Sequence, residues 1–101
     1  MESYSKLVRD RVPEILDGKG VPYEKRVASP EEYKQELIKK LSEEAAEFSE
    51  AGDPEELADV LEVIEALKKL PEYREVEKLR LEKLSERGGF NEKIILKGEK
   101  N

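Results

Sequence analysis

Hydrophobic residues recur at helical spacing in two neighbouring segments of the chain. Consecutive residues of an α-helix turn by about 100°, so residues three or four apart share a face. The first segment carries Leu37, Ile38, Leu41, Ala45 and Phe48. The second segment carries Leu57, Val60, Val63, Ile64 and Leu67. Each set forms one apolar stripe, which predicts two amphipathic helices.

Two similar start signals indicate where these helices begin. Residues 29–32 (Ser-Pro-Glu-Glu) offer an N-cap serine, a proline at the first helical position and a capping-box glutamate. Residues 53–56 (Asp-Pro-Glu-Glu) repeat that pattern. We expect the first helix to run from Pro30 to about Ala51, where Gly52 ends it, and the second to stop before Pro71. Because the connection is so short, the two helices should form an antiparallel hairpin.

The flanks of the hairpin carry weaker signals. A short helix is expected near Pro13, ended by Gly18 and Gly20, and residues 22–27 look extended. A third helical pattern covers residues 71–87, and the apolar tail at residues 90–96 is expected to pack as an extended segment. The predicted fold is therefore an all-α single domain spanning residues 1–101, a helical hairpin plus a further helix.

Composition narrows the classes of protein and of partner. Only 37% of the 101 residues are hydrophobic and 44% are charged, so we expect homo-oligomerisation to complete the helical bundle. The net charge is −6 and no basic block stands out, which argues against a nucleic acid polymer as partner. No apolar run is long enough for a membrane span, and neither a signal-peptide pattern nor cysteine is present. A cytoplasmic protein without a membrane partner is the expectation.

Histidine is absent, and this restricts the chemistry of any active site. A histidine general base, a Ser-His or Cys-His nucleophile pair and histidine-ligated zinc are all excluded. An enzyme built from this sequence must work with carboxylates, amines and guanidinium groups, alone or together with a hard cation.

Two acidic residues lie beside the apolar stripe of the first long helix. Residues 37, 41, 44 and 48 follow the spacing of a buried stripe, so Glu44 is expected at its edge. Glu47 lies three residues further on the same side, whereas Glu43 points away from the stripe. In the second helix, Glu56 projects inside the apolar arc and Asp59 lies at its border, while Glu62 is expected to face the opposite way.

The hairpin should bring these four carboxylates together. Packed helices lie about 8–10 Å apart, so acidic side chains that lean into the seam nearly meet. Like charges at that distance repel, and a compensating cation is needed. All-oxygen ligands favour Mg²⁺, with Mn²⁺ as a possible substitute. Two other interpretations remain open: Glu56 can serve only as a capping-box residue, and Glu44 and Glu47 can be solvated residues paired with lysines.

The acidic residues also form a recognisable motif. Residues 43–47 (Glu-Glu-Ala-Ala-Glu) followed by residues 56–59 (Glu-Leu-Ala-Asp) resemble the E-E-x-x-E … E-x-x-D signature of MazG-like nucleoside triphosphate pyrophosphohydrolases, a group of all-α enzymes. Residues 6–13 and 86–90 look like flanking segments of the same group. The gap between the two acidic motifs is shorter than in many members. This leaves the four ligands intact but implies a nucleotide pocket that is smaller or has different walls.

The resemblance implies hydrolysis of a nucleoside triphosphate to the monophosphate and pyrophosphate, as in house-cleaning of the nucleotide pool. It implies that Glu44, Glu47, Glu56 and Asp59 bind Mg²⁺ and that one of these catalytic carboxylates accepts the proton of the attacking water. Six cations are candidates for binding the substrate phosphates, although each can equally be a solvated surface residue. They are Lys6, Arg9, Arg11, Lys40, Lys83 and Arg87.

Two other functions fit the same sequence. Phosphoribosyl-ATP pyrophosphohydrolase of histidine biosynthesis shares the fold and the metal motif and breaks the same type of bond. A non-catalytic acidic helical module that binds a basic partner, or only itself, is the alternative from another class. The assembly implied by the family is a homodimer or a homotetramer.

Overall fold

The computed structural model describes residues 5–99, and over this range the protein contains helices and no strand. The elements in chain order are α1 (Val12–Gly18), α2 (Pro30–Ala51), α3 (Pro54–Lys68), the 3₁₀ helix η1 (Pro71–Tyr73) and α4 (Val76–Arg87). The prediction of an all-α fold is confirmed. None of the helices in the described range is long and apolar enough to cross a membrane.

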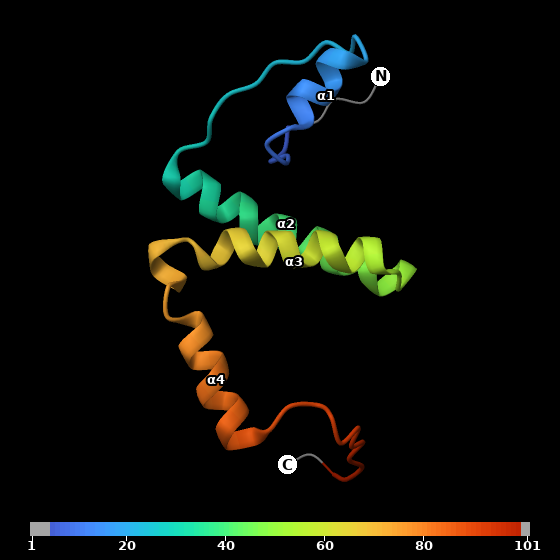
Figure 1. Cartoon of the computed structure of the whole chain (residues 1–101), viewed down its shortest axis with the longest axis vertical. Coiled ribbons are helices and arrows are strands. Elements are labelled where there is room, and N and C mark those ends of the chain that lie inside the picture. The colour runs from blue at the N-terminus through green and yellow to red at the C-terminus, as the bar shows by residue number, and fades with distance from the viewer. Residues whose placement is uncertain (1–4, 100–101) are drawn as a thin grey trace.

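Helices α2 and α3 form the predicted antiparallel hairpin, seen side by side in the middle of Figure 1. The Ser29 side chain accepts a hydrogen bond of 3.2 Å from the backbone N–H of Glu32, and Asp53 accepts one of 2.9 Å from that of Glu56. Gly52 ends α2 in the left-handed conformation with φ 67°, a region that glycine adopts without steric cost. The caps read from the sequence therefore set both ends of the hairpin turn.

The core of the hairpin is very small. Among the described residues only Leu37 of α2, Val63 of α3 and Glu44 of α2 are buried. Other members of the two apolar stripes stay partly open to solvent, at 47% for Ile38 and 42% for Leu57. The hairpin thus buries one seam and leaves much of its apolar surface uncovered.

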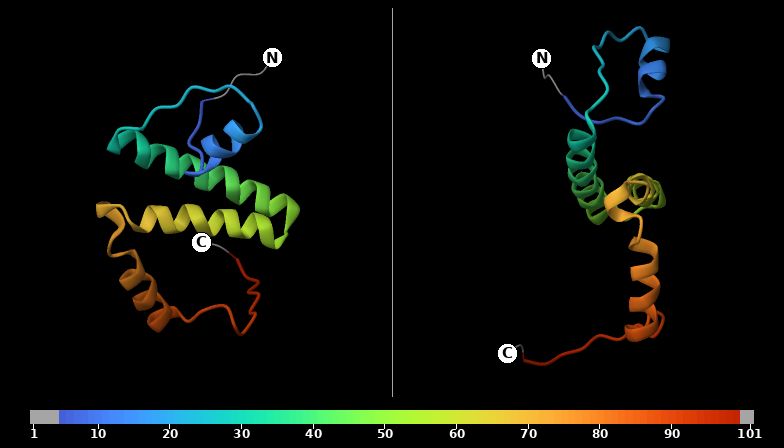
Figure 2. Two further views of the ribbon diagram at one scale, coloured as in Figure 1. Left: turned by 45° about the horizontal axis from the view of Figure 1, so that its top comes forward. Right: turned by 90° about the vertical axis from the view of Figure 1, so that its left-hand side faces the viewer.

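Residues 5–29 lie on one side of the hairpin, and α4 lies on the other (Figure 2). Helix α1 forms near Pro13 as predicted, and Gly20 follows it with φ 69°. Residues 21–29 then return to α2 without forming a helix or a strand. The Arg26 guanidinium donates two hydrogen bonds of 2.6 Å to Glu32, which fasten this connection to the start of α2.

The third helix differs from the prediction, because it is broken near its start. Residues 71–73 form η1, and α4 begins only at Val76. Lys34 of α2 contacts the segment before the break: its ammonium lies 3.3 Å from the Glu72 carboxylate and 5.7 Å from the centre of the Tyr73 ring. These contacts hold η1 against α2, and the chain changes direction before α4 leaves the hairpin (Figure 1).

The packing expected for the tail at residues 90–96 is not seen within one protomer, where its apolar side chains are largely exposed. Phe90 is 97% exposed and Leu96 is 91% exposed. The tail leaves from the far end of α4, away from the hairpin, so no apolar surface of the same protomer covers it (Figure 2). The radius of gyration is 18.1 Å, against about 13 Å for a compact domain of this length.

Candidate metal centre

Three acidic side chains meet in the seam between α2 and α3. Glu44, Glu56 and Asp59 each offer one carboxylate oxygen, and these three oxygens lie within 4.8 Å of one another. Glu44 comes from the packing face of α2, Glu56 from the capped first turn of α3 and Asp59 from the next turn. The predicted meeting of carboxylates across the hairpin is therefore observed for three of the four residues.

Two of these carboxylates are poorly satisfied. The Glu44 residue is 91% buried, since only 9% of its surface is exposed. Its Oε2 atom and the Oε2 atom of Glu56 are both shielded from solvent and have no hydrogen-bond partner. A shielded carboxylate oxygen without a partner is unfavourable, and a cation seated among the three groups would satisfy it. The residues thus fit a bound hard cation.

The charges of the cluster act on Glu56 most clearly. Burial raises the pKa of the Glu56 carboxyl above its usual value, and the neighbouring negative charges of Glu47, Asp53 and Asp59 raise this pKa further. A raised carboxyl pKa means that the negative form is disfavoured at this position. The acidic cluster is therefore under electrostatic repulsion when no cation is bound.

Glu47 has a different place from the other three predicted ligands. It is exposed and lies outside the group of three oxygens. Its negative charge still helps to raise the pKa of the Glu56 carboxyl, after the larger effect of burial. Glu47 thus lies at the open edge of the cluster, and Glu43 is exposed as predicted.

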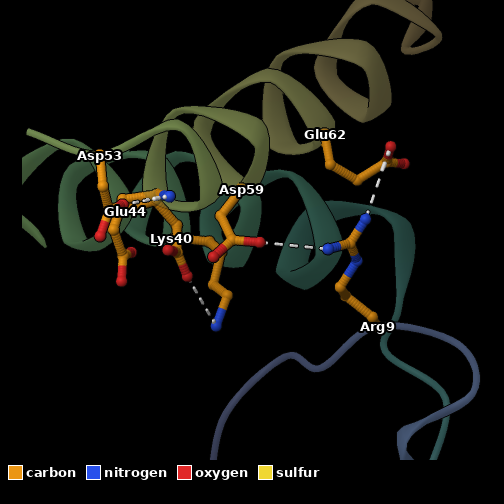
Figure 3. A network of polar contacts seen from close by, with 7 residues as sticks. Arg9, Lys40, Glu44, Asp53, Asp59 and Glu62 are labelled. Atoms are coloured by element: carbon orange, nitrogen blue, oxygen red, sulfur yellow. Dashed lines mark hydrogen bonds and ion pairs between the residues drawn. The ribbon is translucent and has the colours of Figure 1, made fainter. Parts of the chain in front are cut away.

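Two protein cations already contact the cluster (Figure 3). The Lys40 ammonium lies 3.5 Å from Oε1 of Glu44, one helical turn away on α2. The Arg9 guanidinium donates a hydrogen bond of 3.2 Å to Oδ1 of Asp59, and its other terminal nitrogen lies 3.8 Å from Oε1 of Glu62. Positive charge thus reaches the acidic cluster from α2 and from residues 5–11, here called the N-terminal segment.

A cleft of about 320 Å³ lies between the N-terminal segment and the acidic face of the hairpin. Its polar walls combine cations and carboxylates, and its apolar walls are three valines. The lining residues are Lys6, Arg9, Lys40, Glu44, Asp59 and Glu62, with Val8, Val12 and Val63. Three of the six predicted substrate-binding cations and two predicted metal ligands therefore face one space.

The remaining predicted cations lie elsewhere. Arg11 lines a second cavity of about 520 Å³ that shares the Arg9, Lys40 and Glu62 walls, and its guanidinium pairs with Glu14 at 3.0 Å. Lys83 and Arg87 are exposed on α4 and line neither cavity. Within one protomer the structure does not bring these two α4 residues to the acidic cluster.

Glu62 is the site residue that the sequence interpretation missed. Helical periodicity placed it away from the apolar arc, yet its carboxylate pairs with Arg9 and lines both cavities. The reason is that the N-terminal segment lies beside this part of α3, which periodicity within α3 cannot reveal. Its spacing of three residues from Asp59 was the available signal, because residues three apart share a helix face.

Fold and site together define an all-helical protein with a carboxylate cluster in a helical hairpin, faced by basic residues of an N-terminal segment. No protein-family model, no curated protein and no solved structure matches the chain. The chemistry of the site is therefore the ground on which a function is assigned.

Proposed function

We propose that the protein is a Mg²⁺-dependent nucleoside triphosphate pyrophosphohydrolase that releases a nucleoside monophosphate and pyrophosphate. One observation carries this proposal: Glu44, which has a shielded, unpartnered oxygen, lines the same cleft as Lys6, Arg9 and Lys40. Glu56, whose Oε2 is also unpartnered, belongs to the same carboxylate cluster. A metal–triphosphate substrate requires carboxylates that bind the metal ion next to basic side chains that bind the phosphates. The acidic motif that resembles MazG-like enzymes supports the same activity.

The cation would be held by Glu44, Glu56 and Asp59, with Glu47 at the open edge of the cluster. Carboxylate oxygens suit hard cations such as Mg²⁺ and Mn²⁺. Mg²⁺ binds through few carboxylates and leaves positions for water and substrate phosphates, which fits a half-open cluster. When bound, it supplies charge neutralisation at the phosphates and an acidified water.

The protein's own residues then have distinct tasks. Lys6, Arg9 and Lys40 line the cleft and would bind the triphosphate, where their charge stabilises the pyrophosphate group as the bond between the α- and β-phosphates breaks. A carboxylate of the cluster would accept the proton of the attacking water.

The active form would be a homodimer or homotetramer. Exposed apolar residues lie on both arms of the hairpin and along α4 and the tail; they include Ile38, Leu57, Leu61, Leu79, Leu81, Leu84 and Phe90. Helical bundles bury such stripes against other helices. A second copy of the chain would also offer Lys83 and Arg87 from a surface that the protomer does not use.

The test is pyrophosphate release from a panel of standard and modified nucleoside triphosphates and phosphoribosyl-ATP, with Mg²⁺ and with EDTA. Glu44→Gln should lower the rate by at least about a hundredfold, because metal coordination contributes several kcal/mol to such reactions. Glu43→Gln is the matched control, since it makes the same chemical change one residue away at an exposed position. It should keep most of the activity.

The outcomes separate the candidate functions. Release from common triphosphates that needs Mg²⁺ and is lost in Glu44→Gln supports the proposal. Release confined to phosphoribosyl-ATP would replace it with the biosynthetic enzyme. No hydrolysis of any compound by the wild type, with Mg²⁺ or with EDTA, would leave a non-catalytic acidic module as the better description.

A further inference from the structure

Arg9 contacts two acidic residues of α3 at once. Its two terminal nitrogens lie 3.2 Å from Asp59 and 3.8 Å from Glu62, which are one helical turn apart (Figure 3). The closer partner, Asp59, belongs to the three-carboxylate group, and Glu62 does not. One guanidinium therefore bridges a candidate metal ligand and a neighbouring carboxylate outside the cluster.

The two contacts of Arg9 should respond differently to a bound divalent cation. A cation coordinated by Asp59 would neutralise this carboxylate and repel the Arg9 guanidinium. Glu62 is already within reach and would keep its negative charge, because it lies outside the ligand group. The favourable position of Arg9 then moves from Asp59 towards Glu62, along the wall of the same cleft.

Lys40 has no such alternative among its observed partners. Its ammonium pairs with Glu44 on its own helix, and no second carboxylate lies within ion-pairing distance of it in the described structure. Arg9 differs from Lys40 also in its planar group of five donors, which can hold one carboxylate and still bind a phosphate oxygen. The pairing with Glu62 is thus a specific feature of Arg9.

We propose that Glu62 is a positioning residue, which holds the Arg9 guanidinium in the cleft when a metal ion takes over Asp59. The inference rests on the proposed function, since it assigns Arg9 to the phosphates of a metal-bound substrate. Without a metal ion, Arg9 acts as the internal counter-cation of Asp59. With a metal ion, Glu62 prevents Arg9 from leaving the cleft when it loses that partner.

The test is calorimetric titration of the full chain with MgCl₂ alone, without nucleotide, on the four members of a double-mutant cycle. The cycle consists of wild type, Arg9→Gln, Glu62→Gln and the double variant. Arg9→Gln should raise the affinity for Mg²⁺ and Glu62→Gln should lower it, each by about two- to fivefold, the range measured for exposed ion pairs. In the Arg9→Gln background, Glu62→Gln should change the affinity much less.

Glu65→Gln is the matched control for simple loss of charge. It removes the same charge one turn further along α3, where Glu65 pairs with Lys68 at 3.4 Å and not with Arg9. Its effect on Mg²⁺ affinity should be small and equal with or without Arg9, because solvent and salt screen exposed charges over about 8 Å. Arg9, Asp59 and Glu62 are all at the surface, so these variants should keep the helical circular dichroism of the wild type.

Hydrolysis kinetics provide a second readout. Glu62→Gln should raise KM for the triphosphate more than it lowers kcat, because it displaces a phosphate-binding group, and Glu62→Asp should restore part of the loss.

If Glu62→Gln lowers Mg²⁺ affinity by the same factor in both Arg9 backgrounds, the positioning role is wrong and the proposed function stands. Coupled Mg²⁺ affinities without any triphosphate hydrolysis would keep the Arg9–Glu62 link and overturn the proposed function. A wild type that binds no Mg²⁺ would overturn both.

Discussion

The helical hairpin and the α4 arm use their hydrophobic residues in different ways. In the hairpin, Leu37 and Val63 are 4% and 8% exposed, and they close a seam that also contains Glu44. In α4, Leu79, Leu81 and Leu84 are 52%, 50% and 43% exposed, and the tail beyond is almost fully open. The hairpin therefore has its packing partner within the chain, whereas α4 does not.

The difference follows from how each region is stabilised. The hairpin combines two capped helices with a short connection, so its contacts are local and cost little chain entropy. Helix α4 has 12 residues, a length at which an isolated helix is marginal in water. Lys68 lies 3.8 Å from Glu77, and this is the one ion pair between α3 and α4 in the described range. The apolar stripe of α4 is thus left uncovered within the protomer.

The largest predicted effect compares one leucine from each region. Leu37→Ala should cost about 2–5 kcal/mol of unfolding free energy, because it leaves a cavity in the seam. Leu81→Ala removes the same atoms from a half-exposed position and should cost less than about 0.5 kcal/mol in the isolated protomer. Urea denaturation followed by circular dichroism at low protein concentration measures both. Equal costs would show that α4 is packed as firmly as the hairpin.

The sequence predicted the hairpin well because its determinants are local. Each N-cap satisfies a backbone N–H three residues later, and Gly52 needs only its own conformation to end α2. The third helix was predicted as continuous because helical periodicity does not include the contacts of Glu72 and Tyr73 with Lys34, which is far away in sequence. The tail was expected to pack because it is apolar, but hydrophobicity does not say whether a partner surface lies within reach.

The same distinction applies to the site. Glu44, Glu56 and Asp59 were found from periodicity and the short turn, since both fix their positions relative to the seam. The approach of Arg9 to Glu62 depends on where residues 5–11 lie in space, and no period in the sequence contains that information. The cations of α4 were grouped with the site by resemblance, and the place of Lys83 and Arg87 in an assembly remains a prediction.

A second prediction concerns the partner of the exposed apolar surface. Light scattering should return two or four times the chain mass of 11.6 kDa. The melting temperature should rise with protein concentration. For a dimer, each tenfold increase in concentration should add about 1.4 kcal/mol to the free energy of unfolding. Leu61→Glu places a charge on an α3 residue that is 54% exposed and should dissociate the assembly. Ser42→Glu adds the same charge at an exposed polar position of α2 and should not.

A monomer mass at every protein concentration would contradict the prediction that another copy of the chain covers the exposed apolar surface. The α4 arm and the tail would then be a free apolar surface, and the Leu61→Glu and Ser42→Glu variants would behave alike. A mass that falls only in Leu61→Glu would show that the assembly uses the apolar surface of α3.

The smallest predicted effect is electrostatic and lies within the hairpin. The pKa of Glu56 is raised in the folded protein, so the folded state holds this proton more tightly than the unfolded state does. The stabilising contribution of protonated Glu56 is complete below the unfolded carboxyl pKa and is lost as the pH rises through the raised value. In EDTA, Glu56→Gln should therefore show a higher melting temperature than wild type at neutral pH, and this gain should vanish in acid.

Glu32 and Glu77, whose pKa values are lowered by Arg26 and Arg80, act in the opposite direction but equally in both proteins. Added Mg²⁺ should reverse the order, because it stabilises only the protein that keeps the full carboxylate cluster. A variant that melts below wild type in EDTA at neutral pH would mean that Glu56 is a capping residue whose charge stabilises α3, and the cluster would then lose its electrostatic argument for a cation.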